Sequence, residues 1–150
     1  MAGAIARAAL VAGTLDYAAA ITNFLIAGGK EPIRIAWYIA SSLLGRDAAY
    51  AGGWGTATFG IFLHYVIATG WTALFFFGRP RLALFRQNAL LVGAGYGLFV
   101  WVMMNLVLVP LTRIKPAPFN PAAATVQASI LVICIGLPIA LLARRHFAKR

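Results

Sequence analysis

The chain has 150 residues, of which 62% are hydrophobic and only 11% are charged. Soluble domains are about 45–50% apolar and about one quarter charged, so this composition excludes a disordered chain, a disulfide scaffold and an ordinary soluble enzyme. Thirteen Lys and Arg against three Asp and Glu give a net charge of +10. In a membrane protein such cations hold loops against anionic headgroups, so we expect no nucleic-acid partner.

Four apolar stretches are long enough to cross a bilayer, because about 20 residues of helix span about 30 Å of hydrocarbon. They cover residues 8–27, 54–77, 89–109 and 123–143. The sequence therefore predicts an all-α integral membrane bundle of four transmembrane helices, forming a single domain over residues 1–150. Asp16 falls where a cleavable signal peptide needs an unbroken apolar region, so we expect the first stretch to be retained.

The segment between the first two stretches is too apolar to be a free loop. Residues 28–32, with sequence Gly-Gly-Lys-Glu-Pro, break the first helix, and the apolar run over residues 33–45 is too short to span. We predict an amphipathic helix that lies in the interface or is re-entrant and ends at Gly45. Trp37 and Tyr38 are expected at the lipid interface.

Four crossings place both termini on one side of the membrane. Because Lys and Arg are retained in the cytoplasm, the side with more of them is expected to be cytoplasmic. The terminus side carries eight cations and the other side five: Arg7, Arg79, Arg81, Arg86, Arg144, Arg145, Lys149 and Arg150 against Lys30, Arg34, Arg46, Arg113 and Lys115. Both termini are therefore predicted to be cytoplasmic, with Arg144 and Arg145 touching headgroups.

Asp16 and His64 are the two ionisable side chains expected deep in the bilayer, where each costs several kcal/mol if unpaired. Antiparallel helices with a rise of about 1.5 Å per residue bring them to similar depth, with Tyr96 near them. One hypothesis is a proton-accepting or cation-binding cluster. The other is a buried hydrogen-bonded pair that sets helix register.

Further polar and small residues predict helix packing. Asn23 and Asn105 lie at comparable depth, which favours an interhelical amide pair over a substrate-binding role. Small residues let helices approach closely in lipid, and these are Gly13, Gly60, Gly93 and Gly97. Pro138 frees the carbonyl of Cys134, so we expect a kink in the last helix.

Enzymatic chemistry is not indicated by the sequence. Two His, one Cys and three acids do not form a set of metal ligands at the usual spacing. No glycine-rich phosphate loop, serine elbow or Cys–His pair is found. We therefore predict no metal, no cofactor and no enzymatic activity.

Short motifs over most of the chain give a family resemblance. They are Gly13-Thr14-Leu15-Asp16, Ile39-Ala40-Ser41-Ser42-Leu43-Leu44-Gly45, Gly60-x-x-x-His64, Gly93-x-x-x-Gly97, the loop from Pro110 to Pro121, and Gly136-Leu137-Pro138-Ile139-Ala140. In these the chain resembles the YagU-like family of uncharacterised four-span bacterial inner-membrane proteins. The resemblance implies this fold and location but no activity. Similar proteins often carry a second His in the fourth span, where this chain has only apolar residues or Gln127.

The first functional hypothesis is a non-enzymatic membrane protein that associates with itself or serves as an accessory subunit of a larger membrane complex. The residues outside the four spans leave little room for a catalytic or receptor domain. The glycine faces favour contact with other helices, and a four-helix bundle of this size is expected to enclose little cavity. One alternative is a proton- or ion-linked transporter or channel using Asp16, His64 and Tyr96. Another is an accessory protein that binds a lipid or a quinone.

Overall fold

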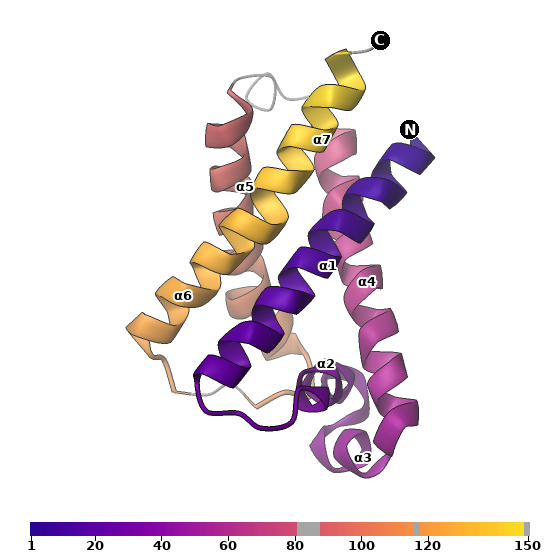
Figure 1. The fold of residues 1–150 in the computed structure, drawn as a ribbon, viewed down its shortest axis with the longest axis vertical. Coiled ribbons are helices and arrows are strands. Elements are labelled where there is room, and N and C mark those ends of the chain that lie inside the picture. Colours follow the sequence, from indigo (N-terminus) through magenta and orange to yellow (C-terminus); the bar gives the residue numbers. More distant parts are fainter. Residues whose placement is uncertain (81–87, 116–117, 149–150) are drawn as a thin grey trace.

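The chain forms four long apolar helices, as seen in a computed structural model that describes residues 1–80, 88–115 and 118–148. The helices that are long and apolar enough to cross a membrane cover Ala2–Ile26, Gly53–Gly78, Ala89–Leu111 and Pro121–Ala148. No strand occurs within the described ranges. The predicted all-α bundle with four spans is confirmed, and both termini lie at the same end of it (Figure 1). We call this the terminus end.

Two of the spans are continuous α-helices and two are interrupted. The first span is α1 (Ala2–Ile26) and the second is α4 (Gly53–Gly78). The third consists of α5 (Ala89–Val102), the π-helical segment η2 (Met103–Leu108) and the 3-10 turn η3 (Val109–Leu111). The fourth consists of α6 (Pro121–Leu131), the π-helical segment η4 (Val132–Gly136) and α7 (Leu137–Ala148).

Each π-helical segment comes shortly before a proline. Pro138 follows η4, and Cys134, whose carbonyl the proline frees, lies in that π-helical turn. Pro110 lies in η3, directly after η2. Proline has no N–H and its ring crowds the carbonyl four residues earlier, so the preceding turn must give up its regular hydrogen bonds. A π-helical turn is one way to accommodate this loss.

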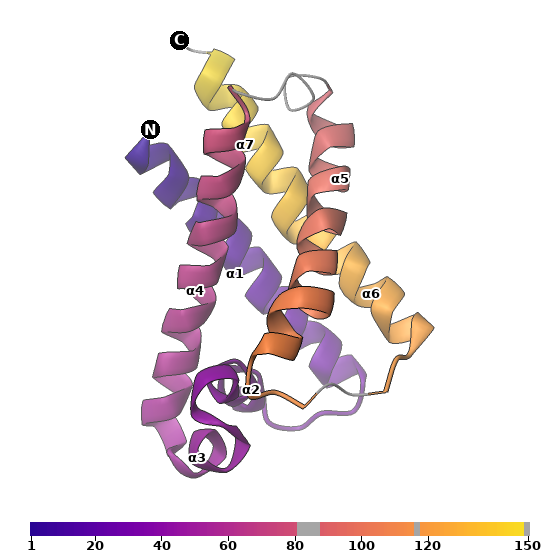
Figure 2. The ribbon, with the colours of Figure 1, turned by 180° about the vertical axis from the view of Figure 1, so that it is seen from behind.

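A short helix between the first two spans is packed under the bundle at the end opposite the termini (Figure 2). This helix is α2 (Ile33–Leu44), and it ends at Gly45, whose φ of 85° suits glycine. The predicted helix and its end are thus confirmed. The segment directly after it forms another short helix, α3 (Arg46–Ala51), which the sequence did not predict.

Glycines set the helix contacts inside the chain. Gly13 lies against Tyr65 and Ala68, and Gly60 meets the backbone carbonyl of Ala36 on α2. On α5, a Cβ at Gly97 would stand 2.7 Å from the carbonyl oxygen of Leu131. Gly93 faces the fourth span in the same way, at Gly136 and Leu137. All four predicted packing glycines therefore have partners within this chain, as close helix packing in lipid requires.

The hydrophobic core fills the half of the bundle nearest the termini. Its largest fully buried hydrophobic side chains are Phe75, Phe76, Ile139 and Val100. Small buried residues bring α1 close to α7, and they are Ala8, Ala12, Ala140 and Ala143. Dense side-chain packing of this kind, rather than the hydrophobic effect, holds helices together in lipid.

Charged residues are placed at both ends of the bundle. Arg7, Arg79, Arg144 and Arg145 belong to the terminus end, whereas Lys30, Arg34, Arg46, Arg113 and Lys115 belong to the end with α2. The other four residues of the predicted charge balance, Arg81, Arg86, Lys149 and Arg150, lie outside the described residues.

Candidate ligand-binding cavity

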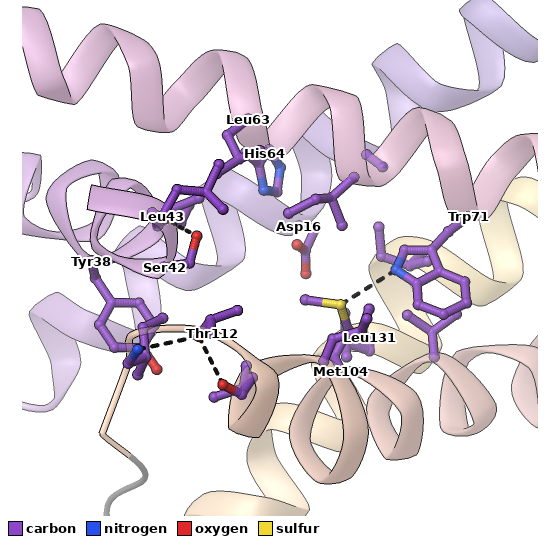
Figure 3. Close-up of a pocket in the computed structure, with 18 of the residues that line it drawn as sticks. Asp16, Tyr38, Ser42, Leu43, Leu63, His64, Trp71, Met104, Thr112 and Leu131 are labelled. Atoms are coloured by element: carbon purple, nitrogen blue, oxygen red, sulfur yellow. Dashed lines mark hydrogen bonds between the residues drawn. The ribbon is translucent and has the colours of Figure 1, made fainter. Parts of the chain in front are cut away.

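A cavity of about 360 Å³ extends from the middle of the bundle to α2 (Figure 3). Side chains from all four spans and from α2 line it. Five of the lining residues are polar or ionisable, and they are Asp16, Tyr38, Ser42, His64 and Thr112. The others are hydrophobic, among them Leu63, Ile67, Trp71, Met104 and Leu131. An apolar concavity with a few convergent polar groups is the usual form of a small-molecule site.

The sequence suggested that the bundle encloses little cavity, and the structure shows a partly open cavity on its α2 side. Helix α2 packs on α4, and its carbonyl at Ser42 accepts a hydrogen bond of 3.0 Å from the backbone N–H of Arg113, just beyond the third span. Helix α2 thereby lies between the ends of α4 and the third span. The π-helical segments η2 and η4 border the same space. We infer that α2 and the two π-helical segments keep the spans apart around the cavity, whereas regular helices would pack together and fill it.

Asp16 extends from α1 into this cavity. In Figure 3 its carboxylate points into the space between His64 and Met104. Within the described part of the chain, the carboxylate makes no hydrogen bond and no ion pair, although His64 is near enough to interact with it electrostatically. An intramembrane carboxylate without a fixed partner is costly, so its orientation into a cavity is a reason to look for a ligand there.

His64 joins α4 to α1. Its Nε2 lies 2.8 Å from the carbonyl oxygen of Gly13, and because a carbonyl only accepts, Nε2 is the donor. The ring packs against Tyr17 and Tyr65, with centroid distances of 5.2 Å and 5.4 Å. The Tyr65 hydroxyl is also 2.9 Å from the Thr14 hydroxyl on α1. His64 thus has a fixed position on the cavity wall beside Asp16.

Tyr96 has a different place from the one expected. Its hydroxyl donates a hydrogen bond of 2.6 Å to the carbonyl of Trp71, and its ring packs on Phe75 at 4.8 Å. It is not among the residues that line the cavity. The structure therefore brings Asp16 and His64 to one cavity, while Tyr96 belongs to the packed core beside it.

Trp71 and Met104 are cavity residues that sequence reasoning missed. The indole N–H of Trp71 donates to the sulfur of Met104 at 3.4 Å, which links α4 to the third span. This contact borders the cavity on the side away from Tyr38 and Leu43 of α2 (Figure 3). No spacing rule relates two residues on different spans, so the sequence contained no signal for this contact.

Helix α2 provides the wall at the other end. Tyr38, Ile39, Ser42 and Leu43 line the cavity, and the Ser42 hydroxyl donates to the carbonyl of Ile39 at 2.7 Å. Burial, with a smaller contribution from Tyr50, raises the pKa of the Tyr38 hydroxyl, so this group is neutral. Trp37 turns elsewhere, because its indole N–H donates to the carbonyl of Gly53 at 2.8 Å.

The expected pair between Asn23 and Asn105 is not formed. The amide of Asn105 donates to the carbonyl of Trp101, one turn back in its own helix, at 3.0 Å. No hydrogen bond joins Asn105 to Asn23 in the described structure. The amide is satisfied locally because the helix offers a carbonyl within reach, which a comparison of depths along two helices does not take into account.

The fold and cavity define a class, a multi-pass α-helical membrane protein with a space inside its bundle. Among the described residues, no group of three or more His, Cys, Asp or Glu comes together as a metal site. No family model, curated protein or solved structure matches the chain. The resemblance to YagU-like proteins stays a prediction.

Proposed function

We propose that this protein is a non-enzymatic membrane protein that binds a small lipophilic cation within its helical bundle, with Asp16 as the group that receives the positive charge. The observation that carries the proposal is the Asp16 carboxylate, which faces an apolar cavity of about 360 Å³ without a hydrogen bond to any described residue. A cationic ligand offsets the cost of that charge, while its apolar part fills the cavity.

The walls of the cavity favour the same class of ligand. Trp71 and Tyr38 provide aromatic rings at opposite ends, and aromatic faces attract cations. The hydroxyls of Ser42 and Thr112 are bonded to backbone carbonyls of their own segments, at 2.7 Å each. Asp16 is therefore the strongest acceptor that a ligand meets, and this argues for a positive group rather than a purely apolar molecule such as a lipid tail.

The test measures binding of tetraphenylphosphonium, a lipophilic cation, to the purified protein in detergent through quenching of tryptophan fluorescence. We expect Asp16→Asn to weaken binding at least about tenfold, which corresponds to about 1.4 kcal/mol. Neutral triphenylphosphine oxide is the comparison ligand and is expected to bind weakly to both forms. Trp71→Phe should remove most of the quenching, because Trp71 borders the cavity.

The control variant is Asp47→Asn, which removes an acid on α3, a helix that does not line the cavity. It should bind as the unmodified chain does. Equal binding by Asp16→Asn, or equal binding of the neutral compound, would overturn the proposal. Thermal melting of each variant in the same detergent shows whether a loss of binding reflects loss of the fold.

A second candidate function is proton- or ion-linked transport past Asp16 and His64. The observation that favours it is the pair of π-helical segments next to prolines, η2 and η4, which border the cavity. Such turns are common at functional sites in helices. Protein in liposomes should then carry a flux of protons or of the cation that Asp16→Asn and His64→Ala abolish while the fold persists. Binding of the cation without any flux would exclude transport and support cation binding alone.

Association with another chain is supported less strongly than the sequence suggested. The glycines at positions 13, 60, 93 and 97 are occupied by partners in this chain, and the bundle does contain a cavity. A homo-oligomer, an accessory role in a larger complex, or an accessory role that binds a lipid or quinone remain hypotheses. Native mass spectrometry of gently solubilised protein would reveal a second chain or a retained lipid or quinone.

We further propose that the protein lies in a bacterial inner membrane with both termini in the cytoplasm. Support comes from the sequence, where eight Lys and Arg on the terminus side stand against five on the other. A thiol-reactive probe that cannot cross membranes tests this orientation. A cysteine placed at Gly3 in a variant lacking Cys134 should react only after cells are opened, and a cysteine placed at Lys30 should react in intact cells with a permeable outer membrane.

A further inference from the structure

The cleft between the two terminal helices is a second candidate binding site. We propose that it binds a phosphate group, that of an anionic phospholipid, between Arg7 on α1 and Arg145 on α7. The proposal concerns the other end of the bundle and does not depend on what occupies the cavity around Asp16. It distinguishes Arg145 from its neighbour Arg144, although the sequence placed both at the lipid interface.

The cleft is a small pocket lined by both basic and apolar side chains. It has a volume of about 260 Å³ and is lined by Ala4, Arg7, Ala8, Leu142, Arg145 and His146. On α1 the lining residues are three and four positions apart, and the same holds on α7, so each set lies on one helix face. Arg144 is exposed but does not line the cleft.

The guanidinium groups of Arg7 and Arg145 both have N–H groups that can donate hydrogen bonds to a ligand. Arg7 uses its Nε to donate to the carbonyl of Gly3 at 3.2 Å, which orients the side chain and leaves its two terminal amino groups. Arg145 makes no hydrogen bond or ion pair with any described residue. Arginine binds phosphate through two parallel hydrogen bonds, so this pair suits a phosphate better than it suits a simple halide.

No side-chain carboxylate of the chain is placed to neutralise this cleft. The chain has three acidic residues. Asp16 faces the cavity, Glu31 pairs with Arg34 at 2.7 Å, and Asp47 is on α3 at the opposite end of the bundle. No side-chain carboxylate therefore competes with an anionic ligand for Arg7 and Arg145.

A phospholipid fits the surroundings better than free phosphate. The cleft lies at the ends of two apolar helices, the level at which headgroups meet the hydrocarbon. The apolar lining residues Ala4, Ala8 and Leu142 can contact the glycerol and upper acyl part of a lipid. Inorganic phosphate has no apolar part that could make this contact. Anionic lipids are also enriched near basic residues at a membrane surface.

Native mass spectrometry of the detergent-solubilised protein, titrated with phosphatidylglycerol, tests the proposal. Arg7→Gln and Arg145→Gln should each raise the apparent dissociation constant of the first bound lipid at least about fivefold. Arg144→Gln removes the same charge one residue away and should change it less than about twofold. Diacylglycerol with the same acyl chains, which lacks the phosphate, should not give a tightly bound species. Unchanged thermal melting of the variants, which alter exposed side chains, shows that the fold is kept.

The other outcomes decide against the proposal. An equal loss in Arg144→Gln would mean diffuse attraction of lipid to a basic surface, with no site. Equal retention of diacylglycerol would mean that the cleft recognises only the apolar part. Displacement of phosphatidylglycerol by an equimolar amount of inorganic phosphate would keep the phosphate chemistry but overturn the lipid as its source.

Discussion

The same four spans pack differently in the two halves of this bundle. Near the termini, Phe75 and Phe76 are fully buried and fill the space among the spans. Toward α2, the walls are apolar as well, yet they leave a partly open cavity of about 360 Å³ into which Asp16 points. Hydrophobic composition alone does not separate a core from a cavity. The difference arises from backbone features, namely α2 between two spans and the π-helical turns before the prolines.

The comparison is tested most strongly by removing large side chains from each half. Phe75→Ala, in the filled half, should lower the free energy of unfolding by about 2–3 kcal/mol, somewhat less than in a soluble core because separated helices remain in lipid. Ile67→Ala, on the cavity wall, should cost less than about 1 kcal/mol, since its partners are already incomplete. Reversible unfolding in mixed micelles measures both. Equal losses would mean that Ile67 is packed as tightly as Phe75 and that the cavity is closed in the micelle.

A smaller loss of stability is expected from adding a methyl group where the two halves meet. Gly97→Ala places a Cβ against the backbone of Leu131 and Val132, so we expect a loss of about 1–2 kcal/mol. Gly95→Ala, on the same helix, meets nothing within 4 Å and should be neutral or slightly stabilising. Thermal melting of the pair in one detergent measures the difference. A similar loss in both would show that α5 packs on the fourth span through another face.

The smallest loss of stability is expected at Tyr96, which lies in the core beside the cavity. Tyr96→Phe removes the hydroxyl that donates to the Trp71 carbonyl and should cost about 0.5–1 kcal/mol. It should leave the affinity for tetraphenylphosphonium unchanged, because Tyr96 does not line the cavity. Fluorescence titration of this variant beside Asp16→Asn makes the comparison. A large loss of affinity in Tyr96→Phe would restore the three-residue cluster that the sequence suggested.

Much of the fold was predictable from the sequence because its signals are local. Uninterrupted apolar stretches identified the four spans, and Gly45 marked the end of α2. Pro138 predicted a kink in the fourth span, and the structure has a π-helical turn just before this proline. The short helix α3 was missed, since six residues give too little periodicity to separate a helix from a turn. Depth along antiparallel helices also brought Asp16 and His64 to one region.

Tertiary structure alone decided the rest. Depth says nothing about rotation around a helix axis or about carbonyls nearby, so it did not separate Tyr96 from the cavity or predict that Asn105 bonds to its own helix. The cavity depends on how α2 is seated against α4 and the third span, a relation among distant segments. Sequence by itself determined which segments are apolar enough to enter a membrane, because transfer into lipid is a property of each segment. Where space is left among those segments is a property of their packing, and only the assembled helices determine it.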